Sequence, residues 1–355
     1  MNRTAKIKKS LAAKEALLVS SASNIYYITG FNGFSHIERE AYTLITKRKN
    51  YIFTDGRYAN RAKQLKGFEF IEISLNKKFK QAIKEIVDLK NIKRLAIETD
   101  NLTINELKQV KPVGKLTPAN NILKDLRKIK DNSEINNIKK ACKIGDKAFY
   151  YILTKLKIGV SEQQISKLIE IFLLENNANT SFSPIVAFGN NSALPHHVPG
   201  NKKLKKNNIV LLDFGVKVNN YCSDMTRTVF FGKASREQKQ IYQTVYASQQ
   251  RVFKYLKSSK SPTGAKADDL ARSLIKTHGY PGIPHSLGHG IGIEVHEKPS
   301  LTPKSKDKLT LNMVFSVEPG IYLPKFGGVR IEDLVVLTKR GPQIITRANR
   351  KIIEL

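Results

Sequence analysis

The hydrophobic and polar positions of residues 209–232 predict two β-strands joined by a short connection. Residues 210–212 form an apolar run of the strand type, and residues 226–231 form a second run of β-branched and aromatic side chains. The pair Asn219-Asn220 lies between the two runs and favours a turn. We expect these strands to form the centre of the second half of the chain.

An aspartate lies beside each of the two predicted strands, at a position where we expect a charged side chain to be energetically unfavourable. Asp213 follows four consecutive apolar residues, and Asp224 stands just before the second run. A buried carboxylate is unfavourable unless it is paired or bound to a metal, and two carboxylates on neighbouring strands also repel each other. A divalent cation between them would remove both costs. We therefore expect further metal ligands elsewhere in the C-terminal half.

The patterns outside this pair predict two domains of an α+β protein. Residues 12–125 alternate short apolar runs with helical patterns, which is typical of a mixed α/β domain. From residue 180 onward, strand patterns alternate with glycine-rich turns. Helical spacing recurs in four segments of the second half, at residues 134–155, 161–174, 235–256 and 265–278. We place the boundary near residue 128, which gives domains 1–128 and 129–355.

Three further residues could complete a metal site with the two aspartates. Glu318 ends a strand-like run before a Pro-Gly pair, Glu332 lies inside the predicted strand 328–337, and His289 lies between two glycines. Each of these residues alone would more often be a surface acid or a hydrogen-bonded histidine. Together with Asp213 and Asp224, all of them beside predicted strands, they favour a metal centre.

The ligand types restrict the metal and its chemistry. Four carboxylates and one imidazole suit Mn²⁺, Co²⁺, Fe²⁺ or Zn²⁺ better than a metal that selects thiolates. Four carboxylates are more than one ion needs, whereas two ions roughly 3.5–4 Å apart could share them all. Such a centre is suited to hydrolysis at an acyl group.

Other histidines lie close to these candidates in the sequence. His196, His285 and His296 could bind a substrate carboxylate or stabilise a tetrahedral intermediate. A structural hydrogen bond is an equally good interpretation for any one of them. We expect His197 and His278 to be structural.

The composition indicates a reducing compartment and shows an unusually high positive charge. Two cysteines argue against a disulfide framework, and neither a transmembrane helix nor a signal peptide is evident, so we expect a cytoplasmic protein. The formal net charge of +31 could indicate a nucleic acid or an anionic membrane as a partner. The basic residues are spread along the chain without a long block, so we favour a solvated basic surface.

Several stretches of the chain resemble one known family. Residues 180–340 contain, in order, ALPHHVPG, LLDFGVKVNNYCSDMTRT, HSLGHGIGIEVHE, SVEPGIY and GVRIED. These motifs resemble the pita-bread metallopeptidases, which include Xaa-Pro aminopeptidase, Xaa-Pro dipeptidase (prolidase) and methionine aminopeptidase. NIYYITGFNGF and IFTDGRYANRA resemble the creatinase-type N-terminal domain of the Xaa-Pro branch. The implied fold is a creatinase-type α/β domain followed by a pita-bread catalytic domain.

The resemblance also implies roles for individual residues. The implied metal ligands are Asp213 on one ion, His289 and Glu318 on the other, and Asp224 and Glu332 as bridges between them. Glu318 would also act as general base or proton shuttle. The residues matched to substrate binding and to stabilisation of the intermediate are His196, His285 and His296, and Arg330 matches an arginine near the bridging glutamate. No separate organic cofactor is implied.

The expected function is that of a dinuclear-metal Xaa-Pro aminopeptidase, with Mn²⁺ favoured and Co²⁺, Zn²⁺ and Fe²⁺ as alternatives. Xaa-Pro dipeptidase is the alternative within the same class, and no sequence feature decides between them. The competing hypothesis from another class is a non-catalytic pita-bread protein that binds nucleic acid or ribosomes. The complete ligand set favours the enzyme. The implied partners are a proline-containing peptide and a second copy of the chain, without a specific nucleic acid or a membrane.

Overall fold

The computed structural model describes residues 3–35 and 38–355. The chain divides into two compact units, Met1–Arg127 and Lys128–Leu355, and each unit is described by itself. Among the described residues, no helix is both long and apolar enough to cross a membrane.

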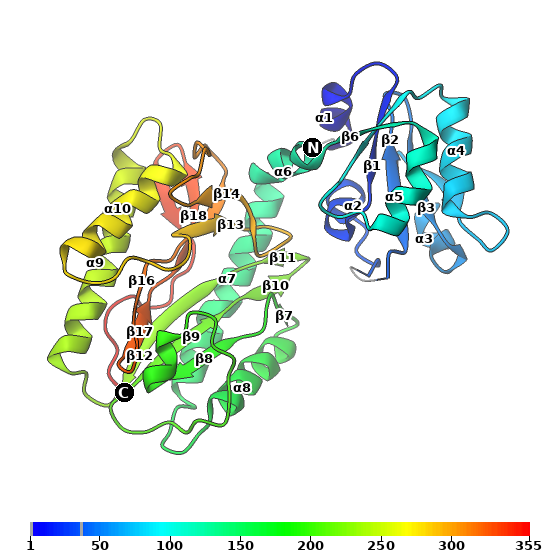
Figure 1. The fold of residues 1–355 in the computed structure, drawn as a ribbon. Helices are drawn as coiled ribbons and strands as arrows, with labels where there is room; N and C mark the ends of the chain where they lie inside the picture. The colour runs from blue at the N-terminus through cyan, green and yellow to red at the C-terminus, as the bar shows by residue number, and fades with distance from the viewer. Residues whose placement is uncertain (1–2, 36–37) are drawn as a thin grey trace. The chain divides into compact units, whose positions relative to one another are not determined.

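The first unit is built on a six-stranded mixed sheet with helices around it (Figure 1). In sheet order the strands are β4 (Glu69–Glu72), β3 (Asn50–Thr54), β2 (Ala41–Ile45), β1 (Glu15–Val19), β5 (Arg94–Ile97) and β6 (Lys115–Pro118). The helices are α1 (Arg3–Ser10), α2 (Ala22–Thr29), α3 (Ala59–Ala62), α4 (Phe79–Leu89), α5 (Ile104–Val110) and α6 (Asn120–Lys128). The apolar face of α4 packs on the sheet, where Phe79 stacks on Tyr42 with ring centroids 3.9 Å apart.

The second unit contains four smaller sheets. A three-stranded sheet consists of β8 (Ile185–Phe188), β9 (Asn208–Phe214) and β12 (Met225–Phe231), and another of β7 (Asn179–Thr180), β10 (Val216–Val218) and β11 (Tyr221–Cys222). A five-stranded sheet consists of β14 (Glu297–Leu301), β13 (Gly288–Gly290), β15 (Val314–Val317), β18 (Asp333–Thr338) and β19 (Gly341–Ile344). The strands β16 (Gly320–Leu323) and β17 (Gly327–Arg330) form a pair.

Long helices cover these sheets in two groups. The helices are α7 (Asn132–Leu153), α8 (Glu162–Glu175), α9 (Arg236–Ser258) and α10 (Gly264–Thr277). One hydrophobic core lies between α7, α8 and the sheet β8-β9-β12, and a second lies between α9, α10 and the five-stranded sheet. Capping boxes begin α7, α8 and α9 at Asp131, Ser161 and Ser235.

The strand β9 is buried on both faces, which explains its uninterrupted apolar run. Val210 and Leu212 face the first core, whereas Ile209 faces the second. The partner strand β12 behaves in the same way, with Val229 in the first core and Phe230 in the second. Asp213 therefore continues a strand that lies in the interior of the unit.

The prediction of one continuous strand over residues 328–337 is wrong in one respect. The chain forms β17 up to Arg330, leaves the strand geometry at Ile331 and Glu332, and enters β18 at Asp333. The break arises because β17 pairs with β16, whereas β18 pairs with β15 in a different sheet. Glu332 thus lies on a two-residue link between sheets.

Candidate active site

A pocket of about 580 Å³ in the second unit brings together the residues selected from the sequence. It is lined by Asp213, Asp224, His289, Glu318, Glu332, His196, His285, His296 and Arg330. His197, which we expected to be structural, lines it as well, and His278 is not among the lining residues. Apolar side chains cover another part of the wall, among them Phe182, Ile185, Val198 and Val295.

Strands of different sheets, and the segments next to them, place the four acids and the imidazole at the pocket. Asp213 lies in β9 opposite Thr226 of β12, and Asp224 comes directly before β12. His289 is the middle residue of β13, and Glu318 follows the end of β15. Glu332 reaches the same place from the link between β17 and β18. The two predicted strands are thus antiparallel partners, and the short β10 and β11 lie between them in the sequence.

The donor atoms of these side chains converge. One ligand atom each from Asp224, His289 and Glu332 lies within 4.8 Å of the others. Nε2 of His289 lies 3.3 Å from Oε1 of Glu318 and 3.8 Å from Oδ2 of Asp224. Carboxylate oxygens and an imidazole nitrogen at such separations are the donors that Mn²⁺, Co²⁺, Fe²⁺ and Zn²⁺ accept.

The buried carboxylates of the pocket repel one another strongly when only the protein's own residues are present. Burial raises the pKa of Asp224 and Glu332 well above the usual range, and the neighbouring carboxylates raise each pKa further. Burial also raises the pKa of Asp213, although the Arg330 guanidinium opposes this shift. Burial lowers the pKa of His289, but Glu318 outweighs burial and brings it to about 9. The centre therefore favours an added positive charge.

The hydrogen bonds of the site provide a test of whether a metal fits. Oδ1 of Asp213, Oδ1 of Asp224 and Oε1 of Glu332 are buried, and none has a hydrogen-bond partner among the residues that the structure describes. An unpartnered buried carboxylate oxygen is costly unless a ligand satisfies it. The donor set and its unpartnered oxygens fit one or two divalent cations.

A hydrogen-bonded chain lies beside the carboxylates. Arg330 donates from Nη2 to Oδ2 of Asp213 at 2.5 Å and from Nη1 to the Tyr322 hydroxyl at 2.7 Å. Nε2 of His285 lies 2.8 Å from the same hydroxyl. Burial raises the pKa of Tyr322 to about 12, so its hydroxyl stays protonated at neutral pH. The chain connects Asp213 to the histidine side of the pocket.

The histidines of the pocket differ in their surroundings. The rings of His289 and His296 meet edge to face, with centroids 4.4 Å apart. Burial lowers the pKa of both His285 and His296, which keeps these imidazoles neutral at neutral pH. His196 is an exposed side chain on the loop that follows β8. The pocket thus offers neutral imidazoles as donors or acceptors to a substrate.

A buried glutamate holds the loop that carries His196. Glu162, at the start of α8, accepts hydrogen bonds from the backbone N–H of Phe188 at 2.8 Å and of Gly200 at 3.2 Å. Its carboxylate also contacts Nε2 of His197 at 2.9 Å. Both ends of the loop are thereby fixed.

Two important residues were not selected from the sequence. Tyr322 links Arg330 to His285, and Thr226 donates to Glu332 at 2.8 Å while it accepts from Nε of Arg330 at 3.0 Å. Both residues lie inside stretches that resemble the family, but nothing in their local pattern distinguishes them from ordinary strand residues. Their roles arise from partners distant in the sequence.

The arrangement is that of a metallopeptidase, and comparison with known proteins agrees. The model of metallopeptidase family M24 matches residues 136–339, and that of the creatinase/prolidase N-terminal domain matches residues 3–129. The chain belongs to metallopeptidase family M24. Its fold is the creatinase-type α/β N-terminal domain followed by the pita-bread catalytic domain, as the sequence predicted.

Individual relatives match the chain along nearly its whole length. An Xaa-Pro dipeptidase of Pyrococcus horikoshii is 34% identical, with 96% of this chain and 94% of that protein covered. The solved structure of an Xaa-Pro dipeptidase from Bacillus anthracis has a TM-score of 0.91 at 35% identity and covers 99% of both chains. That of an X-Pro aminopeptidase from Thermotoga maritima has a TM-score of 0.88 at 33% identity, with 98% of this chain and 100% of that chain covered.

Proposed function

We propose that the chain is a dinuclear-metal Xaa-Pro dipeptidase, which hydrolyses the bond between an N-terminal residue and a C-terminal proline. The observation that carries the proposal is the convergence of Asp224, His289 and Glu332 in the pocket, with buried carboxylate oxygens that lack a protein partner among the described residues. The relatives named as Xaa-Pro dipeptidases support this specificity over the aminopeptidase that we first expected.

The residues present would hold the metals in the way that the sequence resemblance implies. Asp213 would bind one cation, His289 and Glu318 would bind the other, and Asp224 and Glu332 would serve both. When bound, the metal pair supplies Lewis-acid polarisation of the scissile carbonyl and a nucleophile at neutral pH. Mn²⁺ is the first metal to test, followed by Co²⁺, Zn²⁺ and Fe²⁺.

The chain's own residues would bind the substrate and move the proton. Glu318, which lies 3.3 Å from His289, would take a proton from the attacking water and deliver it to the proline nitrogen. His296 would donate a hydrogen bond to the developing oxyanion or to the substrate carboxylate. His285, whose Nδ1 lies 2.8 Å from the backbone oxygen of Ser286 and whose Nε2 lies 2.8 Å from the Tyr322 hydroxyl, would border the substrate as part of the pocket wall. Arg330 would hold Asp213 in place through the 2.5 Å contact. The proline nitrogen needs this proton when it leaves, because without it the C–N bond would have to break to release an amide anion.

Substrate length distinguishes the dipeptidase from the aminopeptidase. The match to the X-Pro aminopeptidase of Thermotoga maritima favours the second candidate, an enzyme that removes the first residue from longer peptides. Metal-stripped protein is assayed with Ala-Pro and with Ala-Pro-Ala, each with and without Mn²⁺. We expect Mn²⁺-dependent hydrolysis of Ala-Pro and little hydrolysis of Ala-Pro-Ala.

Each outcome of this assay has a defined meaning. Preferential hydrolysis of Ala-Pro-Ala would identify the aminopeptidase. Folded protein that cleaves neither peptide with Mn²⁺, Co²⁺ or Zn²⁺ would contradict the peptidase assignment and favour a binding role for the strongly basic chain. In that case a gel shift with RNA that disappears at modest salt would show that the charge acts non-specifically. The homodimer and the cytoplasmic location stay predictions.

A further inference from the structure

One buried amide outside the pocket contacts the peptide groups that precede Glu318 and Glu332. Gln249 is on α9, its side chain is 0% exposed, and it does not line the pocket. Its Nε2 lies 3.1 Å from the backbone oxygen of Val317 and 3.1 Å from that of Ile331. It also lies 3.1 Å from Oδ2 of Asp333. A single side-chain nitrogen thus joins two separate segments of the second unit.

The two backbone oxygens belong to the peptide groups that lead into Glu318 and Glu332. The peptide unit is planar, so fixing its oxygen restricts the orientation of the next residue's nitrogen and Cα. Glu318 follows the last residue of β15, and Glu332 lies on the link outside any strand. A side chain that holds both peptide groups therefore also limits the separation of the two carboxylates.

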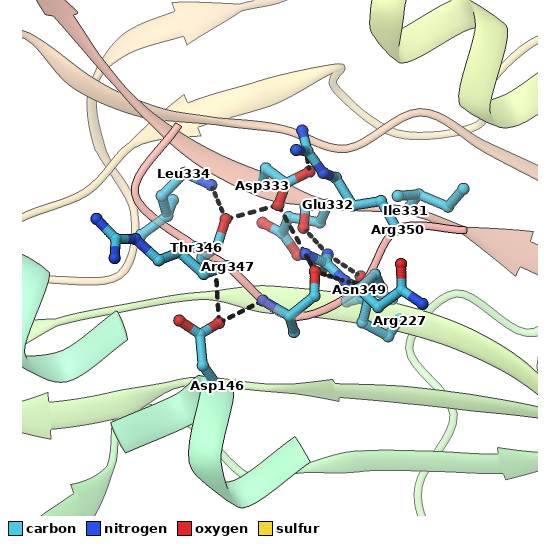
Figure 2. Close-up of polar contacts among 12 residues, drawn as sticks. Asp146, Arg227, Ile331, Glu332, Asp333, Leu334, Thr346, Arg347, Asn349 and Arg350 are labelled. Carbon is cyan, nitrogen blue, oxygen red and sulfur yellow. Dashed lines mark hydrogen bonds and ion pairs between the residues drawn. The ribbon is translucent and has the colours of Figure 1, made fainter. Parts of the chain in front are cut away.

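Arg227 supports the same link from a neighbouring strand. It is 1% exposed and donates from Nη1 to the backbone oxygens of Glu332 and, at 2.9 Å, of Thr226. Nη2 donates to Oδ1 of Asp333 at 2.7 Å and to the backbone oxygen of Ala348 at 2.9 Å. Figure 2 shows Arg227 beside Glu332 and Asp333, together with the C-terminal segment that contains Thr346 and Asn349. These side chains add to the backbone hydrogen bonds of the link, which run from the N–H of Glu332 to the oxygen of Thr226 at 3.1 Å and from the N–H of Ile331 to that of Pro319 at 3.4 Å.

Gln249 places an amide in a part of the core that is otherwise largely apolar. It lies on a helix whose buried face is largely apolar, with Val245, Val252 and Phe253 as neighbours in the sequence. Its Oε1 is buried and has no hydrogen-bond partner among the residues that the structure describes. An apolar residue of similar size would avoid the cost of the unsatisfied oxygen, but it would leave the three acceptors of Nε2 without this donor. A requirement at the site would explain why an amide occupies this position.

We propose that Gln249 is a positioning residue of the metal centre, which fixes Glu318 and Glu332 relative to each other through the peptide groups of Val317 and Ile331. Arg227 contributes by holding the oxygen of Glu332 itself. This inference rests on the proposed function, because it assumes that both glutamates bind metal. Residues that orient metal ligands from outside the ligand set typically change metal affinity or activity by about 10–100-fold when they are replaced.

The test compares Q249M with a matched control on the same helix. Q249M keeps the length and volume of the side chain but removes both N–H donors. The control is S248A, because Ser248 is also 0% exposed but donates only to the backbone oxygen of Ala271 in α10. Metal-free wild type and both variants are titrated with Co²⁺ by calorimetry, the absorption spectrum of bound Co²⁺ is recorded, and the kinetics of Ala-Pro hydrolysis are measured.

We expect Q249M to bind Co²⁺ about 10–100-fold more weakly, with an altered Co²⁺ spectrum and a lower kcat at nearly unchanged KM. S248A should retain the wild-type Co²⁺ affinity and spectrum. A folded Q249M with wild-type affinity, spectrum and kcat would overturn the inference. If Q249M does not fold, Q249N, which keeps an amide of shorter reach, is judged by the same measurements. Wild-type protein that binds no Co²⁺ would overturn the proposed function instead.

Discussion

Buried carboxylates in the two units differ in how their oxygens are satisfied. In the first unit, Glu106 accepts from Nε and Nη2 of Arg39 at 2.8 and 2.6 Å, from the Tyr42 hydroxyl, and from the N–H and hydroxyl of Thr103 at 2.7 and 2.9 Å. In the second unit, Asp224 and Glu332 each retain a buried oxygen without a partner among the described residues.

The directions of the pKa shifts follow this difference. Burial raises the pKa of Glu106, but the hydrogen bonds from Arg39, Tyr42 and Thr103 outweigh it and leave the pKa below its usual value. For Asp224 and Glu332, burial and neighbouring carboxylates act in the same direction and raise the pKa. A satisfied buried carboxylate stabilises the fold, whereas an unsatisfied group of them is suited to bind a cation.

Removing a carboxylate from the active site should have the largest effect. D224N should lower Mn²⁺-dependent kcat/KM for Ala-Pro by about 10³-fold, or roughly 4 kcal/mol, because a ligand shared by the cations is lost. The melting temperature of metal-free D224N should equal or exceed that of metal-free wild type, because the change relieves repulsion between buried charges. Unchanged hydrolysis by D224N would contradict the assignment of Asp224 as a ligand.

The corresponding change in the first unit should lower stability and leave metal binding and activity unchanged. E106Q should destabilise that unit by about 2 kcal/mol, since the partly buried Arg39 would lose its charged partner. The affinity for Mn²⁺ and the activity per folded molecule should stay at the wild-type level. Urea unfolding followed by circular dichroism, together with calorimetric metal titration, measures both quantities. A loss of metal affinity in E106Q would contradict the distinction between Glu106 and the carboxylates of the pocket.

The pH dependence of the unfolding free energy should show a smaller effect that also separates Glu106 from the carboxylates of the pocket. The pKa of Glu106 is lower in the folded protein than in the unfolded chain, where it is about 4.3. The stability that it contributes is therefore fully present above that value and is lost as the pH falls through the folded pKa. The difference in unfolding free energy between wild type and E106Q should shrink below about pH 4.3. A difference that stays constant or grows on acidification would contradict this account of Glu106.

The sequence predicted those parts of the site that leave a local pattern. Asp213 was found because β9 is buried on both faces, which produces an apolar run that ends in a charged residue. Glu318 was found because it follows such a run before a Pro-Gly pair. Glu332 was selected as a candidate, but the prediction that it lies inside a strand was wrong. The β-type sequence pattern continues through the link where the chain passes from one sheet to another.

The remaining parts depend on contacts that a linear pattern does not contain. Tyr322 and Thr226 act through Arg330, His285 and Glu332, which are their neighbours only after the strands have paired. Gln249 resembles any polar residue on an amphipathic helix until the peptide groups before Glu318 and Glu332 are placed beside it. The family resemblance implied the ligands but gave no indication of these supports.

The most direct test of the central claim is a calorimetric titration of metal-stripped wild type, D224N and E106Q with Mn²⁺. The account predicts two Mn²⁺ ions per chain for wild type and for E106Q, and the loss of at least one of them in D224N. Wild-type protein that binds no Mn²⁺, or a D224N variant with the same stoichiometry and affinity as wild type, would contradict the claim that the unsatisfied carboxylates form a metal centre.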